Sequence, residues 1–245
     1  MSSTSETGHA KNVANFFTLK AFVVGYGEKY NPSKRVLELP NLLLIHTAGK
    51  QAVKNVVDAV APYETVVNTR ADEFDDVQEY ATQLINALQS SDASERTIED
   101  GKAFLRKIRG QRAEKKKEPK PGEPTPVTHS ASQTSYDQTI QHMEGISALL
   151  KNEPSYAPNE PELRVDAVEQ KIARLNTTND AVATQEQTIS NARLYRDNIL
   201  YNNPDSLVTV AKGVKTYVKS VFKAHSPEYR QISGIPFKMY KTDES

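Results

Sequence analysis

The chain of 245 residues contains no cysteine and no tryptophan, and aromatic residues make up only 7% of it. The absence of cysteine excludes disulfides, thiol chemistry and a cysteine-based zinc site. Lysine and arginine number 31, as do aspartate and glutamate, so no net charge draws the protein toward polyanions. The scarcity of aromatic residues favours packed helices with thin aliphatic seams.

Long apolar runs are also missing. No stretch approaches the roughly 20 apolar residues that a membrane-spanning helix needs. Residues 1–8, MSSTSETG, lack the basic and apolar regions of a signal peptide. We therefore expect residues 1–10 to form a disordered tail and the protein to be cytoplasmic.

A proline-rich segment lies near the middle of the chain. Four prolines, at 119, 121, 124 and 126, fall within eight residues. Each lacks a backbone donor and pushes its predecessor out of the helical region, so neither a helix nor a central strand can pass through. Residues 112–131 are therefore predicted to be a flexible linker rich in lysine and proline.

On both sides of this linker, apolar residues recur at helical spacing, and no segment shows sustained period-two alternation. The pattern predicts an all-α protein with two similar antiparallel helical bundles of three to four helices, at 11–111 and 132–235, and a tail at 236–245. The alternative is one elongated bundle in which the halves pack together. The second expected helix starts between residues 33 and 40 and is kinked at Pro62. The other expected helices cover residues 11–29, 72–88 (a continuation of the second helix or a third one), 97–109, 132 or 135 to 151, 161–201, 206–223 and 226–233.

The two halves resemble each other when they are shifted by 126 positions. Tyr30-Asn31-Pro32-Ser33 then falls on Tyr156-Ala157-Pro158-Asn159, and Phe17 falls on Met143. Because helical periodicity alone would not place a turn, the shared turn favours an internal duplication over chance similarity of two amphipathic segments. The structural repeat positions are Tyr30, Pro32, Arg70, Tyr156, Pro158 and Arg196.

One basic run is a candidate polyanion-binding site. Clustered cations beside a flexible segment can neutralise phosphates, but the run lacks interleaved aromatic residues that could stack on bases. A solvated helix end is the alternative, because cations suit a helix C-terminus. The residues are Arg106, Lys107, Arg109, Arg112, Lys115, Lys116 and Lys117.

Catalytic motifs are absent from the sequence. The five histidines have no partner histidine at helical spacing, and neither a nucleophile elbow nor a phosphate-binding glycine loop occurs. The acidic group at 72–79 lacks the spacing of a calcium loop and is typical of a helix N-terminus. We therefore assign no catalytic, cofactor-binding or metal-binding residues, and expect no cofactor and no enzymatic activity.

Several phrases resemble a family of uncharacterised, predicted all-helical proteins of Bacteroidetes-type bacteria. This resemblance covers most of the chain and implies a bacterial source and the same two-part helical plan. It implies no activity and no functional residues. The phrases are NVANF at 12–16, GYG with YNPS at 25–33, SYAPNE at 155–160, YVKSVF at 217–222, and SPEY with ISGI at 226–235.

The sequence leaves three functional hypotheses open. The first is a non-enzymatic helical scaffold or protein-interaction module, whose partner is another protein. The alternative is a nucleic-acid-associated protein that binds through residues 106–117. The third is an enzyme with an unrecognised site between the halves, which would need a concave pocket that holds several titratable groups with shifted pKa values. The oligomeric state is open.

Overall fold

A computed structural model describes residues 6–111 and 134–240 of the chain. Within these two ranges every regular element is a helix and no strand occurs, which confirms the all-α prediction. The expected linker at 112–131 lies outside the described residues. Among the helices of the described ranges, none combines the length and the apolar character that crossing a bilayer requires.

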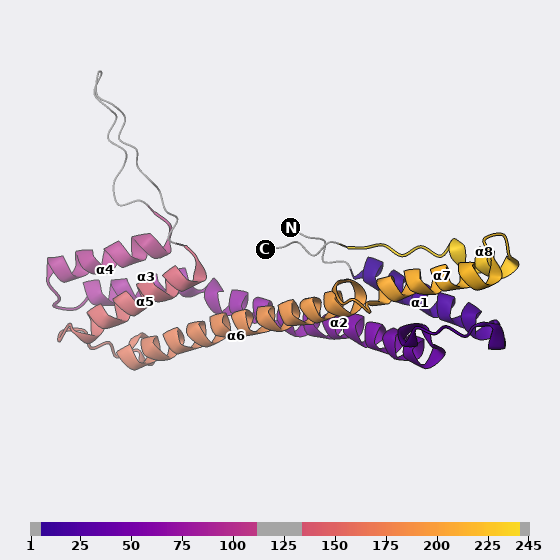
Figure 1. The fold of residues 1–245 in the computed structure, drawn as a ribbon. Helices are drawn as coiled ribbons and strands as arrows, with labels where there is room; N and C mark the ends of the chain where they lie inside the picture. The colour runs from indigo at the N-terminus through magenta and orange to yellow at the C-terminus, as the bar shows by residue number, and fades with distance from the viewer. Residues whose placement is uncertain (1–5, 112–133, 241–245) are drawn as a thin grey trace, which may run out of the picture. The chain divides into compact units, whose positions relative to one another are not determined.

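The helices are labelled in Figure 1, and short 3-10 and π turns (η) connect some of them. Their bounds in chain order are α1 Thr7–Gly25, η1 Gly27–Lys29, η2 Arg35–Leu37, α2 Leu39–Asp75, α3 Val77–Gln89, α4 Glu95–Ile108, α5 Tyr136–Lys151, η3 Pro161–Leu163, α6 Val165–Asp197, the π turn η4 Asn198–Asn202, α7 Leu207–Phe222 and α8 Pro227–Ser233.

Serine side chains cap three of these helices. The hydroxyls of Ser94, Ser135 and Ser226 each accept a hydrogen bond from the backbone N–H three residues later. Such a bond satisfies one of the four N–H groups that a helix start leaves unpaired. After α4, Gly110 adopts a φ of 66°, which costs glycine little. These three helices start within two residues of the expected positions 97, 135 and 226.

Parts of both predicted tails make defined structure within the described residues. Helix α1 already begins at Thr7, and His9, which was assigned to the disordered tail, lies in its first turn. Lys238, which lies beyond α8, is held by Asn12 of α1. The Asn12 side chain donates to the carbonyl of Lys238 at 2.7 Å and accepts from its N–H at 3.1 Å. These partners are more than 200 residues apart, so local sequence gave no sign of them.

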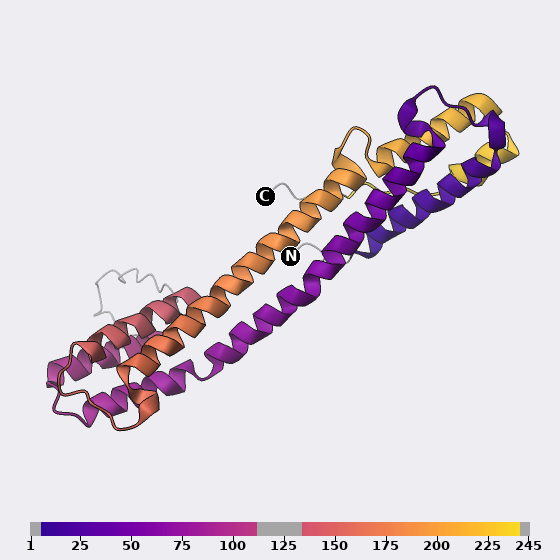
Figure 2. The same cartoon turned by 90° about the horizontal axis from the view of Figure 1, so that it is seen from below.

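Helix α2 starts at Leu39, inside the predicted range of 33–40, and continues through Pro62 to Asp75; Figure 2 shows it as an unbroken ribbon. Helix α6 begins later than the predicted residue 161, because Pro161–Leu163 forms a separate 3-10 turn and the α-helix begins at Val165. At its other end α6 passes directly into the π turn η4.

The chain folds into two compact units that do not correspond to its two halves. Unit 1 contains residues 1–63 and 185–245, and unit 2 contains residues 64–184. The predicted separation into bundles at 11–111 and 132–235 is therefore corrected. The physical reason is that α2 and α6 are each long enough to contribute one end to each unit.

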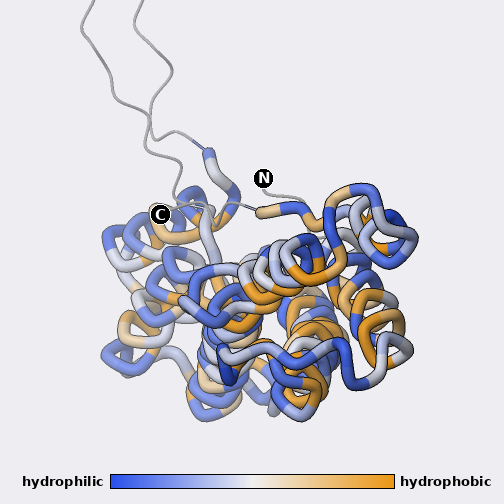
Figure 3. Tube along the Cα trace, turned by 45° about the vertical axis from the view of Figure 1, so that its right-hand side comes forward, coloured by the Kyte–Doolittle hydropathy of each residue, from blue (hydrophilic) through white to orange (hydrophobic). Residues whose placement is uncertain are grey.

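Each unit has its own apolar core. In unit 1 the core joins α1, the turn after it, the start of α2, η4 and α7. An added Cβ on Gly49 of α2 would lie 2.8 Å from Leu207 of α7, so these helices approach closely there. In unit 2 the core joins α3, α4, α5 and the first part of α6. Along the helices, apolar and polar stretches alternate, as expected for buried seams with solvated outer faces (Figure 3).

The turns that lead into α2 and α6 have the same hydrogen bonds. The Tyr30 hydroxyl donates to the carbonyl of Leu37 at 2.7 Å, and the Tyr156 hydroxyl donates to that of Leu163 at 2.7 Å. A 3-10 turn follows each tyrosine, and the next α-helix begins at Leu39 or Val165. Every one of these features recurs 126 positions later.

In α1, however, the gapless shift of 126 positions fails. It pairs Phe17, whose side chain is 51% exposed, with Met143, which is fully buried. A shift of 127 instead pairs the four buried apolar residues of this helix with buried apolar residues. The pairs are Val13 with Ile140, Phe16 with Met143, Leu19 with Ile146, and Val23 with Leu150.

Candidate functional site

The densest group of buried charges lies at the end of α6 in unit 1. Arg196 is only 6% exposed, and its guanidinium lies 2.6 Å from Glu6 Oε1 and 2.7 Å from Asp197 Oδ1. Burial opposes the charge on Arg196, but hydrogen bonds to the two carboxylates outweigh it and raise the arginine pKa. Arg196 therefore keeps its charge between the two carboxylates, and we call the three residues the ion triad.

A polar network adjoins this triad through the π turn η4. Tyr201 Oη lies 2.8 Å from Nδ1 of His9 and accepts a hydrogen bond from Asn12 Nδ2 at 3.2 Å. Burial raises the pKa of Tyr201 to about 12. Burial, together with the charge of Arg196, lowers the pKa of His9. At neutral pH the tyrosine and the histidine are therefore both uncharged.

This network has the features of a structural connection and not of a catalytic site. Its charges are paired inside the group, and Asn12 satisfies both the N–H and the carbonyl of Lys238. One acceptor, Glu6 Oε2, is buried without a partner. In the part of the chain that the structure describes, no group of three His, Asp or Glu side chains could hold a metal ion. The arrangement joins the start of α1 to the C-terminal segment.

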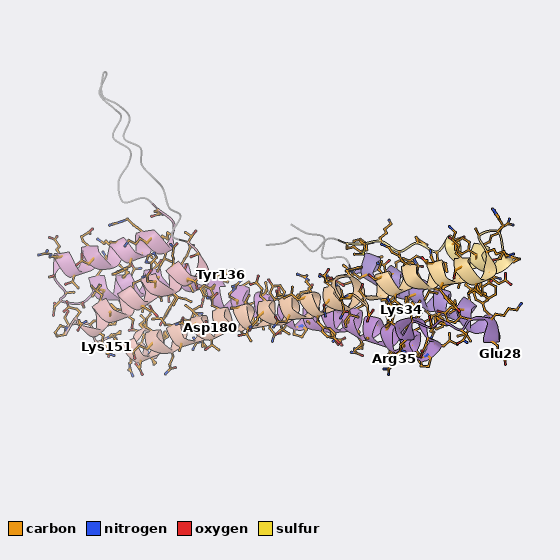
Figure 4. The ribbon with its side chains drawn as sticks, in the orientation of Figure 1. Glu28, Lys34, Arg35, Tyr136, Lys151 and Asp180 are labelled. Atoms are coloured by element: carbon orange, nitrogen blue, oxygen red, sulfur yellow. The ribbon has the colours of Figure 1, made fainter. Side chains whose placement is uncertain are left out.

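Arg70, the position 126 residues before Arg196, has a comparable place in unit 2. Its Nη1 donates to Asn179 Oδ1 at 3.0 Å, and its guanidinium lies 4.0 Å from the centre of the Tyr136 ring. Asn179 in turn donates to Asp137 at 2.7 Å. Tyr136 is the first residue of α5 (Figure 4). Each arginine therefore contacts the N-terminal end of a helix, α1 or α5, directly or through one side chain.

The candidate polyanion-binding residues are only partly described. Arg106 lies 4.0 Å from Glu99, Lys107 lies over the ring of Phe104, and Arg109 donates to Thr82 at 2.8 Å. These three cations therefore already have contacts within unit 2. Arg112, Lys115, Lys116 and Lys117 lie outside the described residues.

Two carboxylates of the acidic group at 72–79 form ion pairs that sequence reasoning missed. Lys171 of α6, 8% exposed, lies 3.1 Å from Glu73 and 2.8 Å from Asp76. Burial would raise the pKa of Glu73, but hydrogen bonds from Arg174 and Lys171 lower it overall. The pairing joins α2 and α6 within unit 2, and no local signal indicates it because the partners are nearly 100 positions apart.

Within the described residues of unit 2, the one histidine is His142 of α5. It is 6% exposed, and its Nε2 atom is buried without a hydrogen-bond partner. Its ring centre lies 6.5 Å from that of Phe104. Burial, and to a smaller extent the charge of Lys107, lowers its pKa. No second titratable group with a complementary shift adjoins it, so it has no partner for acid–base chemistry.

A shallow hollow of about 330 Å³ lies between α1 and α8. Phe22 and Pro227 supply apolar walls, and the Tyr26 hydroxyl donates to the carbonyl of Glu228 at 2.7 Å. Glu228 and Tyr26 are its only ionisable lining residues. It is therefore not the pocket with several shifted titratable groups that an active site would need.

The surface of unit 1 carries exposed apolar side chains on α1 and α2. Phe17 and Val24 lie two turns apart on α1 and are 51% and 53% exposed, and Leu43 of α2 is 51% exposed. The ring of Phe17 lies 5.3 Å from that of His46, so these two helix faces adjoin. We call this surface the apolar patch; its members are Ala14, Phe17, Ala21, Val24 and Leu43, all exposed.

Unit 2 carries polar side chains at the matching places. The counterpart of Val24 is Lys151 and that of Leu43 is Glu169, and these two form an ion pair at 2.8 Å between α5 and α6. Lys151 is the last residue of α5 (Figure 4). The counterpart of Phe17 is the exposed Glu144. The apolar patch is therefore specific to unit 1.

Comparison with protein-family models, with curated proteins and with solved structures finds no match to the chain. The resemblance to a bacterial family of helical proteins therefore stays a prediction.

Proposed function

We propose that the protein is a non-enzymatic, helical protein-interaction module that binds its partner through the apolar patch of unit 1. The observation that carries this proposal is the exposure of Phe17, Val24 and Leu43 on adjoining helix faces. Exposed apolar side chains cost solvation free energy, and large groups of them on a protein surface mark interaction sites. In unit 2 the counterparts of Val24 and Leu43 are Lys151 and Glu169, which form an ion pair. Charged side chains of this kind are expected on a surface that binds no partner.

Two charges placed in the patch test this function. Phe17→Glu combined with Leu43→Glu should abolish binding of the natural partner, because a docked partner would have to desolvate both carboxylates. The measurement is recovery of partners by the tagged full-length chain from a lysate of the encoding organism, with and without nuclease. The matched control is Gln141→Glu with Ala148→Glu on the exposed face of α5, which should retain the partner.

Two outcomes would contradict the proposal. One is equal recovery by the patch variant and the control. The other is recovery that collapses on nuclease treatment, which would favour the alternative of nucleic-acid binding through residues 106–117. The internal contacts of Arg106, Lys107 and Arg109 give that alternative less support.

We also infer that the two halves arose by internal duplication. The shared hydrogen bonds of Tyr30 and Tyr156 support this origin, as do the positions of Arg70 and Arg196. Four buried positions of α3 also match four of α7 at a constant shift: Val77, Ala81, Leu84 and Leu88 correspond to Leu207, Ala211, Val214 and Val218. On this basis α1 to α4 correspond to α5 to α8.

A further inference from the structure

We propose that the apolar patch docks an amphipathic helix of a partner protein whose polar face is acidic. This inference rests on the proposed function and adds the chemistry of the partner.

The helices that carry the patch have an unusual charge distribution. Helix α1 contains no aspartate and no glutamate, and neither does the segment 39–57 of α2. The same two stretches contain four lysines, although the whole chain has equal numbers of positive and negative side chains. One of these, Lys54, forms an ion pair with Asp58. Among the described residues, Lys11, Lys20 and Lys50 have no carboxylate partner, so a bound ligand could supply one.

Two of these lysines border the patch directly. Lys20 Nζ lies 5.2 Å from the centre of the Phe17 ring. Phe17 in turn adjoins His46, and Lys50 lies one turn after His46 on α2. Burial, together with the positive charges of Lys20 and Lys50, lowers the pKa of His46. An acidic partner would place its carboxylates next to these ammonium groups, and complementary charge favours encounter and fixes register.

Unit 2 shows that this charge pattern is not a requirement of the fold. The corresponding helical stretches there carry five carboxylates. They are Asp137, Glu144, Asp166, Glu169 and Asp180. Because one fold tolerates both patterns, the absence of carboxylates from α1 and from residues 39–57 needs a separate reason. Recognition of an acidic ligand supplies that reason.

The geometry favours a helix as the ligand. The apolar residues of α1 follow helical spacing, with Ala14, Phe17, Ala21 and Val24 on one face, and Leu43 lies one turn before His46 on the adjoining face of α2. A helix laid along this surface would contact it through side chains at i, i+3, i+4 and i+7. The lysines at the border would then meet its polar face.

Other occupants fit less well. A second copy of the chain using the same surface would bring like charges together, which is unfavourable. An anionic membrane attracts clusters of four to eight cations, whereas only three unpaired lysines are spread over this surface. A membrane-bound helix also needs a broad apolar face, and here Lys20 and Lys50 border a narrow one.

The test uses site-specific photo-crosslinking in the full-length chain, expressed in the encoding organism. The substitution Phe17→p-benzoylphenylalanine places the crosslinker in the patch, and Glu144→p-benzoylphenylalanine is the matched control at the corresponding place in unit 2. We expect an adduct at position 17 and none at position 144. Mass spectrometry of the crosslinked peptide should identify an amphipathic helical segment with net negative charge.

Charge reversal supplies the second readout. Lys20→Glu with Lys50→Glu should reduce the adduct yield at least about tenfold, and raised salt should reduce it in the unmodified background, because Coulomb attraction is screened. The control is Lys212→Glu with Lys219→Glu on α7, which should leave the yield unchanged.

Each other outcome overturns the proposal in a distinguishable way. An adduct with a protein segment that lacks acidic residues would leave the interaction module standing and refute the acidic ligand. An adduct with a second copy of the chain or with lipid would refute the acidic helix, and would show that the patch binds the chain itself or a membrane instead. Equal yields at positions 17 and 144, or no adduct at either, would refute the patch as a binding site and the proposed function with it.

Discussion

At the scale of single residues, His142 makes the stability of unit 2 dependent on pH. Its pKa is lowered by burial and by Lys107, so the folded protein keeps it neutral below the ordinary histidine value of about 6.5. As the pH falls through about 6.5, the unfolded chain takes up a proton that the folded protein does not. The free energy of unfolding therefore decreases in this window, and the decrease stops below the lowered pKa.

His142→Leu should weaken this dependence, since leucine does not titrate and leaves no buried nitrogen without a partner. The measurement is the free energy of unfolding from denaturant titrations between about pH 5 and pH 7.5. His225→Leu, at an exposed histidine, controls for the loss of an imidazole. If the two variants show the same slope against pH, His142 is not the group responsible.

Residue contacts could be predicted from the sequence only where both partners are local. The helix starts next to Ser94, Ser135 and Ser226 could be predicted to within two residues, because a cap and its helix are adjacent in the chain. The ion pairs of Lys171 and Arg196 were not, because Glu73 and Glu6 are 98 and 190 positions away. The apolar patch was also missed, since helical periodicity did not distinguish the buried Phe16 from the exposed Phe17.

At the scale of elements, the turns before α2 and α6 are expected to contribute equally to stability. In each, a tyrosine hydroxyl donates to a carbonyl seven residues later at 2.7 Å. Tyr30→Phe and Tyr156→Phe should each lower the free energy of unfolding by about 1 kcal/mol, the usual net value of one such bond. The control is Tyr195→Phe on α6, whose side chain is 49% exposed.

Denaturant titration of the three variants gives the comparison. A loss for one tyrosine and none for the other would show that the turns are not equivalent, despite their shared geometry. The turn sequences themselves were recognisable beforehand, because Tyr-x-Pro occurs in both. The helix boundaries around them were harder to predict. In the second half a 3-10 turn replaces the first α-helical turn that was expected at residue 161, and in the first half the prediction gave only a range for the start of α2.

At the scale of the whole molecule, sequence patterns predicted the helices but not their grouping. The proline-rich segment indicated a division of the chain into halves, whereas unit 1 combines the first 63 residues with the last 61, and unit 2 lies between them. Periodicity reports which face of a helix is buried and gives no information about which helix covers it. Long helices such as α2 and α6 can therefore exchange partners without any local signal.

This grouping has a consequence for fragments of the chain. A fragment of residues 1–111 contains α1 to α4 but lacks α7, which supplies much of the unit 1 core, and α5 and α6, which supply much of the unit 2 core. A fragment of residues 134–245 lacks the other half of each core. Neither fragment should fold into either unit alone, whereas two independent bundles would each fold.

The test compares each fragment with the pair and with the intact chain, by circular dichroism and by size-exclusion chromatography. We expect each fragment alone to show reduced helicity and no cooperative thermal transition, and the mixed fragments to form a 1:1 complex with helicity close to that of the intact chain. Cooperative, monomeric folding of either fragment alone would contradict the grouping into units 1 and 2. Homodimers of a single fragment would instead indicate that the two halves are similar enough to replace each other, as duplication predicts.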